Sequence, residues 1–308
     1  MGQRILVTGS AGFIGRYLYR YLADQGFDLV GLDKLRGSEV DIVSDLSDGH
    51  QLTRVLCSTT PDVIIHCGAI KDLEECQKER MLAWNTNVGS THWIVQYLLG
   101  KPGKKVIYIS SDIVFDGKKG NYTEHAPPNP VNWYGTTKFH GELLLRQLDN
   151  YAICRTALVL GDLTEQYRQL LKHELAQPIL GNQTLLPHYV YNRLIRGNPV
   201  AFPDDVVSSP THLELVGLAI ARILQLDLRG IFHVSGAEQI SRYGFAARVA
   251  EYHRLSRDLV RVDNTRISPI RPKNVGLNTE STFARLGIAA KDWNVDGILR
   301  LLVWEELL

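Results

Sequence analysis

Three glycines near the amino terminus constrain this chain more than any other feature of its 308 residues. Gly9, Gly12 and Gly15 follow a short β-branched run at residues 4–8 and open a segment, residues 13–25, whose apolar side chains recur at helical spacing. A glycine turn between a strand and a helix lets the backbone approach a phosphate, and N–H groups at the helix start bind its charge. We therefore predict that this loop holds the pyrophosphate of a dinucleotide, although the spacing G-x-x-G-x-x-G also fits an ordinary tight turn.

Short apolar segments alternate with helical ones along the first half of the chain. Further strands are expected at residues 28–32, 40–43, 62–66, 105–110, 151–155 and 230–235, and further helices at 49–58, 81–99, 133–148, 213–226 and 241–253. This alternation predicts an α/β fold with a doubly wound parallel sheet that is covered by helices on both faces. The regularity weakens after residue 160, so we expect a smaller second domain there.

Composition and charge exclude several classes of protein. The chain has 34 Lys and Arg against 33 Asp and Glu, and a net charge of +1 offers no footprint for nucleic acid or an anionic membrane. No apolar run approaches the roughly 20 residues that span a bilayer, and the amino terminus lacks the pattern of a signal peptide. The four cysteines form no C-x-x-C pair and the histidines no H-x-x-x-H pair. We therefore expect reduced thiols, no metal site and a cytoplasmic location.

The residues after the second and third predicted strands indicate how the adenosine part of the cofactor could be bound. Asp33 ends the second strand, where a carboxylate can accept hydrogen bonds from the adenosine ribose, which favours NAD. Lys34 and Arg36 follow directly and could hold the 2′-phosphate of NADP, or they could belong to a solvated loop. The choice between NAD and NADP stays open. Asp45 and Leu46, after the third strand, could flank the adenine or form an ordinary loop.

A tyrosine and a lysine in the helix at 133–148 form a second candidate site. Tyr134 and Lys138 are four residues apart and therefore share one helix face. The Lys138 ammonium would stabilise the Tyr134 phenolate and lower its pKa toward neutrality. Ser111 follows the strand at 105–110, at the sheet edge where ligands bind, and could donate to a substrate oxygen that Tyr134 protonates. An isolated pair of this kind is usually a surface feature, but its occurrence after a nucleotide loop predicts a proton-transfer site.

Taken together, these motifs resemble the extended short-chain dehydrogenase/reductase family, and within it the dTDP-4-dehydrorhamnose reductase-like subgroup of sugar-nucleotide reductases. The resemblance runs nearly from end to end. The stretches that carry it are TGSAGFIG at residues 8–15, PDVIIHCGA at 61–69, NVGS at 87–90 and SSDIVFDG at 110–117, followed by Y-x-x-x-K at 134–138.

The resemblance implies a role for each matching residue. The implied catalytic residues are Ser111, Tyr134 and Lys138. The implied cofactor, NAD or NADP, would contact Gly9, Ala11, Gly12, Phe13, Ile14, Gly15, Asp33, Lys34, Asp45, Leu46, Cys67, Gly68, Ala69, Asn87 and Ser110, as well as Tyr134 and Lys138. The implied substrate contacts are Lys71, Ser111, Asp112, Phe115, Asn132 and Arg155.

The expected activity is the NAD(P)H-dependent reduction of a 4-keto-6-deoxy sugar nucleotide, with hydride from the nicotinamide and a proton from Tyr134. By the resemblance, residues 1–158 with 206–236 form the NAD(P)-binding domain, residues 159–205 with 237–308 form the substrate-binding domain, and a homodimer is an open option.

The chain also departs from the subgroup. Ile113 and Leu158 stand where aromatic residues are usual near the sugar, and the connection at 162–188 is longer than usual. Two alternatives therefore stay open. One is a dinucleotide-binding regulatory subunit like the β-subunit of methionine adenosyltransferase, and the other is a sugar-nucleotide epimerase.

Overall fold

The computed structural model of the chain describes residues 3–176, 183–265 and 268–307. The chain divides into two compact units. The first unit comprises Met1–Asp116, Ala126–Thr156 and Val216–His233, and the second comprises Gly117–His125, Ala157–Leu215 and Val234–Leu308. The expected boundary after residue 158 lies two residues beyond the observed one, and residues 117–125, 206–215 and 234–236 fall in the second unit rather than the first.

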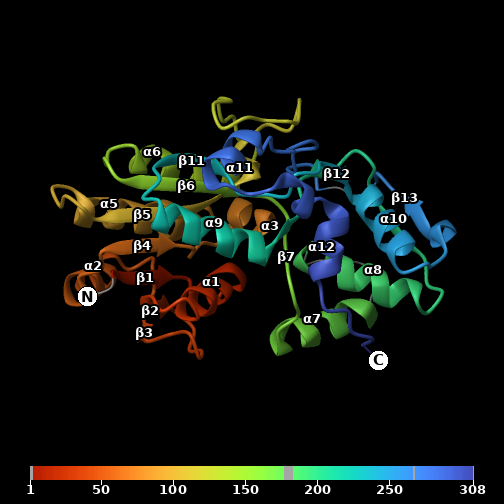
Figure 1. Cartoon of the computed structure of the whole chain (residues 1–308), viewed down its shortest axis with the longest axis horizontal. Helices are drawn as coiled ribbons and strands as arrows, with labels where there is room; N and C mark the ends of the chain where they lie inside the picture. Colours follow the sequence, from red (N-terminus) through yellow and green to blue (C-terminus); the bar gives the residue numbers. More distant parts are fainter. Residues whose placement is uncertain (1–2, 177–182, 266–267, 308) are drawn as a thin grey trace. The chain divides into compact units, whose positions relative to one another are not determined.

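A single parallel sheet forms the centre of the first unit. Its strands are β1 (Arg4–Thr8), β2 (Asp28–Asp33), β3 (Ile42–Val43), β4 (Val63–His66), β5 (Lys105–Ser111), β6 (Tyr151–Thr156) and β11 (Gly230–His233). Their order is β11-β6-β5-β4-β1-β2-β3, as Figure 1 shows, and every neighbouring pair is parallel. The predicted α/β class is therefore confirmed. The direction of strand addition reverses between β1 and β4, and such a reversal opens a crevice at the carboxyl ends of the two strands.

Helices bury both faces of this sheet. Every residue of β4 and β5 is buried, which requires cover on each side. The helices are α1 (Phe13–Ala23), α2 (Gly49–Thr59), α3 (Leu73–Lys78), α4 (Arg80–Trp84), α5 (Ser90–Leu98), α6 (Trp133–Leu145) and the part of α9 (Leu213–Gln225) from Val216 onward. Helices α2, α5 and α6 pack side by side, and Gly217 lets α9 approach the Tyr17 and Tyr21 rings of α1.

The continuous helix expected at residues 81–99 is interrupted. A π-helical turn, Asn85–Gly89, separates α4 from α5, and the Ser90 N–H donates to the Asn85 carbonyl five residues back. The wider turn directs Asn87 into the protein, where its side chain is 1% exposed. Apolar spacing alone does not reveal a π-turn, because the inserted residue leaves the pattern on either side unchanged.

The second unit holds three short strand pairs around a helical core. Strand β7 (Val159–Leu160) pairs with β10 (Thr211–His212), β8 (Val200–Phe202) with β13 (Val260–Val262), and β9 (Val207–Ser208) with β12 (Ile240–Ser241). The helices are α7 (Glu165–Ala176), α8 (Leu186–Leu194), α10 (Arg242–Tyr252), α11 (Glu280–Leu286) and α12 (Val295–Leu301). Helices α7, α8, α10 and α12 share an apolar core, to which Leu186, Val190, Phe245, Val249 and Ile298 belong.

Parts of two sequence-based expectations lie outside the described residues. The long connection at 162–188 carries α7 and the start of α8, but its residues 177–182 are among those not described. The expectation that the amino terminus lacks a signal-peptide pattern rests partly on Met1 and Gly2, which are not described either. Within the described residues, no helix is both long and apolar enough to cross a membrane.

Candidate functional site

The glycine loop lies at the carboxyl end of β1, beside the point where the strand order reverses. Gly9 has a φ of +71°, and a Cβ there would lie 2.6 Å from the Gly68 backbone. A Cβ on Gly15 would collide with the Gly9 carbonyl. The extended residue Gly12 precedes α1, and within the described chain no side chain caps that end of the helix. The loop therefore offers bare backbone and a helix start to an anion, the arrangement that a pyrophosphate requires.

Asp33 is fixed against this loop. Its carboxylate accepts hydrogen bonds from the Ala11 N–H at 3.1 Å and from the Leu35 N–H at 3.0 Å. Lys34 is exposed beside it. Arg16 was not predicted, yet its guanidinium donates to the Ala11 carbonyl at 3.0 Å and lies 3.5 Å from the buried Glu39 carboxylate. The position of Arg16, directly after the third glycine, is the only signal in the sequence that could have indicated this contact.

The segments after β3 and β4 close the other side of the loop. Leu46 is buried, and its Cδ1 approaches Gly68 so closely that a Cβ on this glycine would collide with it. Asp45 is exposed and accepts hydrogen bonds from Ser47 at 2.8 Å. Burial raises the pKa of the Cys67 thiol to about 12, so Cys67 is a neutral side chain at physiological pH. Apart from the exposed Asp45, this side of the crevice is therefore formed by small or apolar groups.

Asn87 ties the segment after β4 to α6. Its Oδ1 accepts from the Ile70 N–H at 2.8 Å, while its Nδ2 donates to the Ile70 carbonyl at 3.0 Å and to Thr137 Oγ1 at 2.9 Å. Thr137 lies between Tyr134 and Lys138 in α6. The π-helical turn thus positions an amide that fixes the 67–70 segment relative to the catalytic candidates.

Ser111 and Tyr134 meet at the carboxyl end of β5. Asn132 caps α6 by accepting the Gly135 N–H at 2.8 Å, and the absence of a side chain at Gly135 lets the helix approach the Ile113 carbonyl. Ser111 ends β5, and its hydroxyl lies close enough to the Tyr134 phenol to favour the phenolate. The Ser111 hydroxyl also lies 3.0 Å from Asp112 Oδ1. Two predicted catalytic side chains, distant in the sequence, are therefore in contact.

The third catalytic candidate, Lys138, lies one helical turn beyond Tyr134 and is only 2% exposed. Its Nζ is 3.9 Å from the centroid of the Tyr108 ring. Burial lowers the pKa of Lys138 from 10.5 to about 7.

The expected lowering of the Tyr134 pKa is wrong for this structure. Burial raises the pKa of this phenol, and the nearby Ser111 hydroxyl only opposes that effect. The cost of placing a phenolate in the interior therefore outweighs the attraction of neighbouring donors.

Some predicted ligand contacts lie deeper than expected. Arg155 and Phe115 are fully buried, with the guanidinium carbon 5.0 Å from the ring centroid, so neither side chain presents a surface to a sugar. Arg155 instead forms a two-pronged ion pair with Glu142, which also accepts a hydrogen bond from Ser110. Among the predicted sugar contacts, Lys71 alone is exposed. Arg155 is charged and Phe115 is aromatic, and neither residue type by itself distinguishes a ligand contact from a buried pair.

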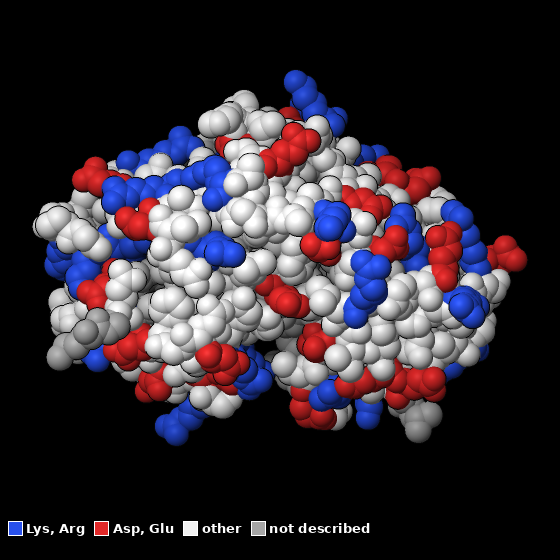
Figure 2. All heavy atoms as spheres, viewed as in Figure 1, with Lys and Arg blue, Asp and Glu red and all other residues white. Residues whose placement is uncertain are grey.

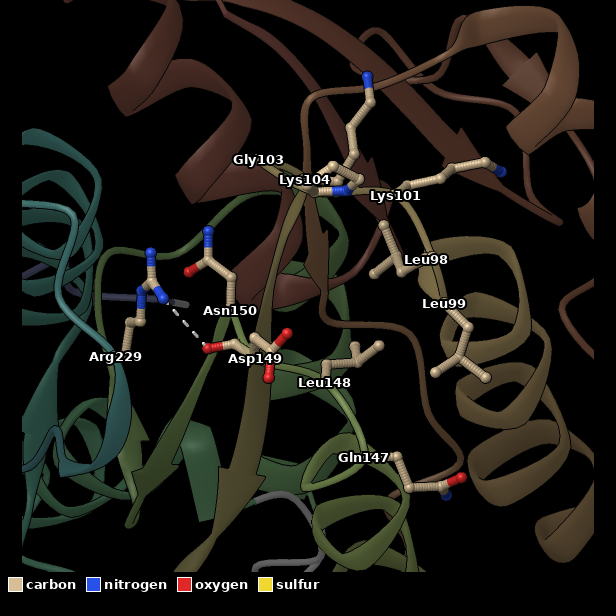
Figure 3. A pocket seen from close by; sticks show the side chains of 12 residues that line it. Leu98, Leu99, Lys101, Gly103, Lys104, Gln147, Leu148, Asp149, Asn150 and Arg229 are labelled. Atoms are coloured by element: carbon tan, nitrogen blue, oxygen red, sulfur yellow. Dashed lines mark hydrogen bonds between the residues drawn. The ribbon is translucent and has the colours of Figure 1, made fainter.

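A separate surface pocket lies at the opposite edge of the sheet, before β5, β6 and β11. It measures about 370 Å³. Within it Arg229 donates a hydrogen bond to the Asp149 carbonyl at 3.4 Å, drawn as a dashed line in Figure 3. Lys104, another lining residue, donates to Asp62 at 2.9 Å. Because ligands of such sheets bind at the carboxyl ends of the strands, we do not assign this pocket to the cofactor. Figure 2 shows basic and acidic side chains interspersed over the face of the molecule that is in view.

Known proteins resemble the chain over nearly its whole length. Methionine adenosyltransferase 2 subunit beta from Danio rerio is 28% identical over 306 residues, covering 94% of this chain and 90% of the relative. A dTDP-4-dehydrorhamnose reductase from Aggregatibacter actinomycetemcomitans is 27% identical over 304 residues, covering 94% of this chain and 95% of the relative. The crystal structure of a Bacillus anthracis dTDP-4-dehydrorhamnose reductase in complex with NADP superposes with a TM-score of 0.78 at 24% identity, covering 98% and 99% of the two chains.

The family model described as "RmlD substrate binding domain" matches residues 3–302, almost the entire chain. This match agrees with the parallel sheet, the glycine loop and the contact between Ser111 and Tyr134. The chain therefore belongs to the RmlD substrate-binding-domain family.

Proposed function

We propose that this protein is an NAD(P)H-dependent reductase of a 4-keto-6-deoxy sugar nucleotide. The observation that carries the proposal is the proximity of the Ser111 hydroxyl to the Tyr134 phenol at the carboxyl end of β5, with Lys138 one turn further along α6. The similarity of the chain to a dTDP-4-dehydrorhamnose reductase supports the same function.

The residues around the glycine loop fit a dinucleotide. The cradle between Gly9, Gly15 and Gly68 exists only because none of them carries a Cβ. In this proposal the loop holds the pyrophosphate, Asp33 faces the adenosine ribose, and Lys138 holds the nicotinamide ribose. When bound, the reduced nicotinamide supplies the hydride.

The proposed chemistry of the chain itself is proton transfer. Tyr134 gives its phenolic proton to the alkoxide that forms at the ketone, and the Ser111 hydroxyl holds the same oxygen. The raised pKa of Tyr134 keeps the phenol protonated at neutral pH, which suits a proton donor. Lys138 then stabilises the tyrosinate left behind. Lys71 and Asp112 are proposed to contact the sugar, and a homodimer and a cytoplasmic location stay predictions.

Reduction of dTDP-4-dehydrorhamnose with each reduced cofactor tests this proposal. We expect oxidation of NADH or NADPH together with formation of a 6-deoxyhexose by the native protein. Tyr134→Phe should lose at least about a hundredfold in kcat, the usual contribution of a general acid, while its affinity for the cofactor stays nearly unchanged. A Tyr134→Phe variant that turns over at the native rate would contradict the role of this residue.

A regulatory role is the second candidate, because methionine adenosyltransferase β-subunits are among the similar proteins. The presence of Ile113 and Leu158, in place of aromatic residues expected near a sugar, favours it. Under this alternative the protein binds NAD(P) but reduces no keto sugar, and it changes the activity of a methionine adenosyltransferase when the two are mixed. The same assay with both proteins present separates the two candidates.

A further inference from the structure

The ammonium of Lys138 lies over the face of a buried aromatic ring. Its Nζ is 3.9 Å from the centroid of Tyr108, which is in β5. Tyr108 is 0% exposed and Lys138 is 2% exposed. An ammonium attracts the negative face of an aromatic ring, and the attraction is stronger when both partners are removed from water. Tyr108 was absent from the predicted site because nothing in the sequence relates it to Lys138.

Gly141 shows that α6 accommodates this ring closely. It lies three residues after Lys138, on the same side of α6, and any Cβ there would collide with the Tyr108 hydroxyl. A glycine inside a helix is unfavourable, because it has more backbone freedom to lose than alanine. The close approach of Tyr108 to the helix gives this glycine a packing reason, and it seats the ring beneath Lys138.

Charged groups by themselves do not account for the position of the Lys138 ammonium. Glu142 lies one turn further along α6 and favours the protonated form of Lys138, but its carboxylate is already paired with Arg155 at 2.7 Å. The other titratable groups that act on Lys138 come from β4, the segment after it and α3, and they are His66, Cys67 and Cys76. Burial lowers the pKa of His66 to about 3 and raises the pKa of each of the two thiols to about 12, so all three are neutral at pH 7.

We propose that Tyr108 is a positioning residue whose ring face seats the Lys138 ammonium in the catalytic crevice and keeps it protonated near neutral pH. This inference rests on the proposed function, in which Lys138 serves Tyr134 and the nicotinamide ribose. Tyr108 itself touches neither substrate nor cofactor and acts only through Lys138.

The direct test is the titration of Lys138 in the cofactor-free protein. Lysine labelled with ¹³C at Cε gives a resonance for each side chain, and the one missing from Lys138→Met identifies Lys138. Tyr108→Phe retains the ring, so its midpoint should match the native one. Tyr108→Leu removes the ring, and we expect its midpoint to fall by about 0.5–1.5 pH units, the equivalent of a cation–π contact. An unchanged midpoint in a folded Tyr108→Leu variant would overturn the proposal.

A second series avoids the risk that leucine disturbs the core. Phenylalanine carrying one, two or three ring fluorines at position 108 keeps the shape of the ring while progressively weakening its negative face. The Lys138 midpoint should fall stepwise along the series. A flat series overturns the proposal even if Tyr108→Leu does not fold.

The pH dependence of sugar reduction provides the functional readout. In Tyr108→Leu the alkaline limb of kcat should move to lower pH by the same amount as the titration midpoint, with activity recovered on acidification. A purely structural role would lower kcat at every pH and would overturn the proposal. The two claims are tested separately. Absence of turnover in the native protein would contradict the proposed function, whereas the NMR titration tests the role of Tyr108 and requires no turnover.

Discussion

Replacing Glu142 by glutamine should destabilise the first unit by about 3–5 kcal/mol, the usual cost of leaving a buried charge without its partner. The Glu142 Oε2 accepts from Arg155 Nη2 at 2.7 Å, and its Oε1 accepts from Arg155 Nε at 3.0 Å and from Ser110 Oγ at 2.7 Å. Both charged side chains are 0% exposed. A glutamine fills the same space, but it is neutral and its NH₂ group would face a guanidinium donor. Arg155 would then be a buried cation with one acceptor lost.

Urea unfolding, followed by circular dichroism and tryptophan fluorescence, measures this cost. Arg155→Met removes the other charge, and the double variant should be less destabilised than the sum of the two single variants by about 1–3 kcal/mol. Asp28→Asn is the matched control, because its ion pair with Arg4 is 48% exposed on each side and should contribute less than about 1 kcal/mol. If Glu142→Gln costs no more than this control, the pair contributes little to the stability of the sheet, and the reasoning is refuted.

Two further predictions concern the glycine loop and Lys138. Gly26→Ala should cost about 1–2 kcal/mol because this glycine has a positive φ, and Gly9→Ala should cost more because its added Cβ would also collide with the Gly68 backbone. Only Gly9→Ala should lose NAD(P) affinity, since the Gly26 position is open while Gly9 faces the Gly68 backbone; equal affinities by calorimetry would contradict the proposed cradle. Burial lowers the pKa of Lys138 from 10.5 to about 7, so between pH 7 and 10 the unfolded chain binds a proton that the folded chain does not. The free energy of unfolding should therefore rise with pH over that window more in the native protein than in Lys138→Met. Urea unfolding at a series of pH values measures this, and midpoints that change in parallel in the two proteins would contradict it.

Much of the first unit follows from local sequence pattern. The strands expected at residues 4–8 and 28–32 correspond to β1 and β2, and the glycine loop between β1 and α1 has the positive φ and close backbone contact that bare glycine permits. These features are readable because strand and helix periods, and the special conformations of glycine, depend on residues close together in the chain. The pairing of Tyr134 with Lys138 is predictable for the same reason, since one helical turn relates them.

The less regular elements were not predictable in this way. The π-helical turn at Asn85–Gly89 leaves the apolar spacing of its neighbours intact, and α3 is a short helix of six residues with little periodicity. The strand pairs of the second unit are two or three residues long. Segments this short carry too few residues for a period to be recognised, and tertiary contacts decide their conformation.

The sequence by itself determined the alternation of strands and helices, the phosphate-binding turn and the residue types of the candidate catalytic site. Only the tertiary structure decided what those residues face. It buried Arg155 against Glu142 rather than toward a ligand, and it brought Tyr108 beneath Lys138. The physical reason is that a charge or a ring has no fixed role until burial and neighbours set the dielectric around it, and those neighbours come from different helices and strands.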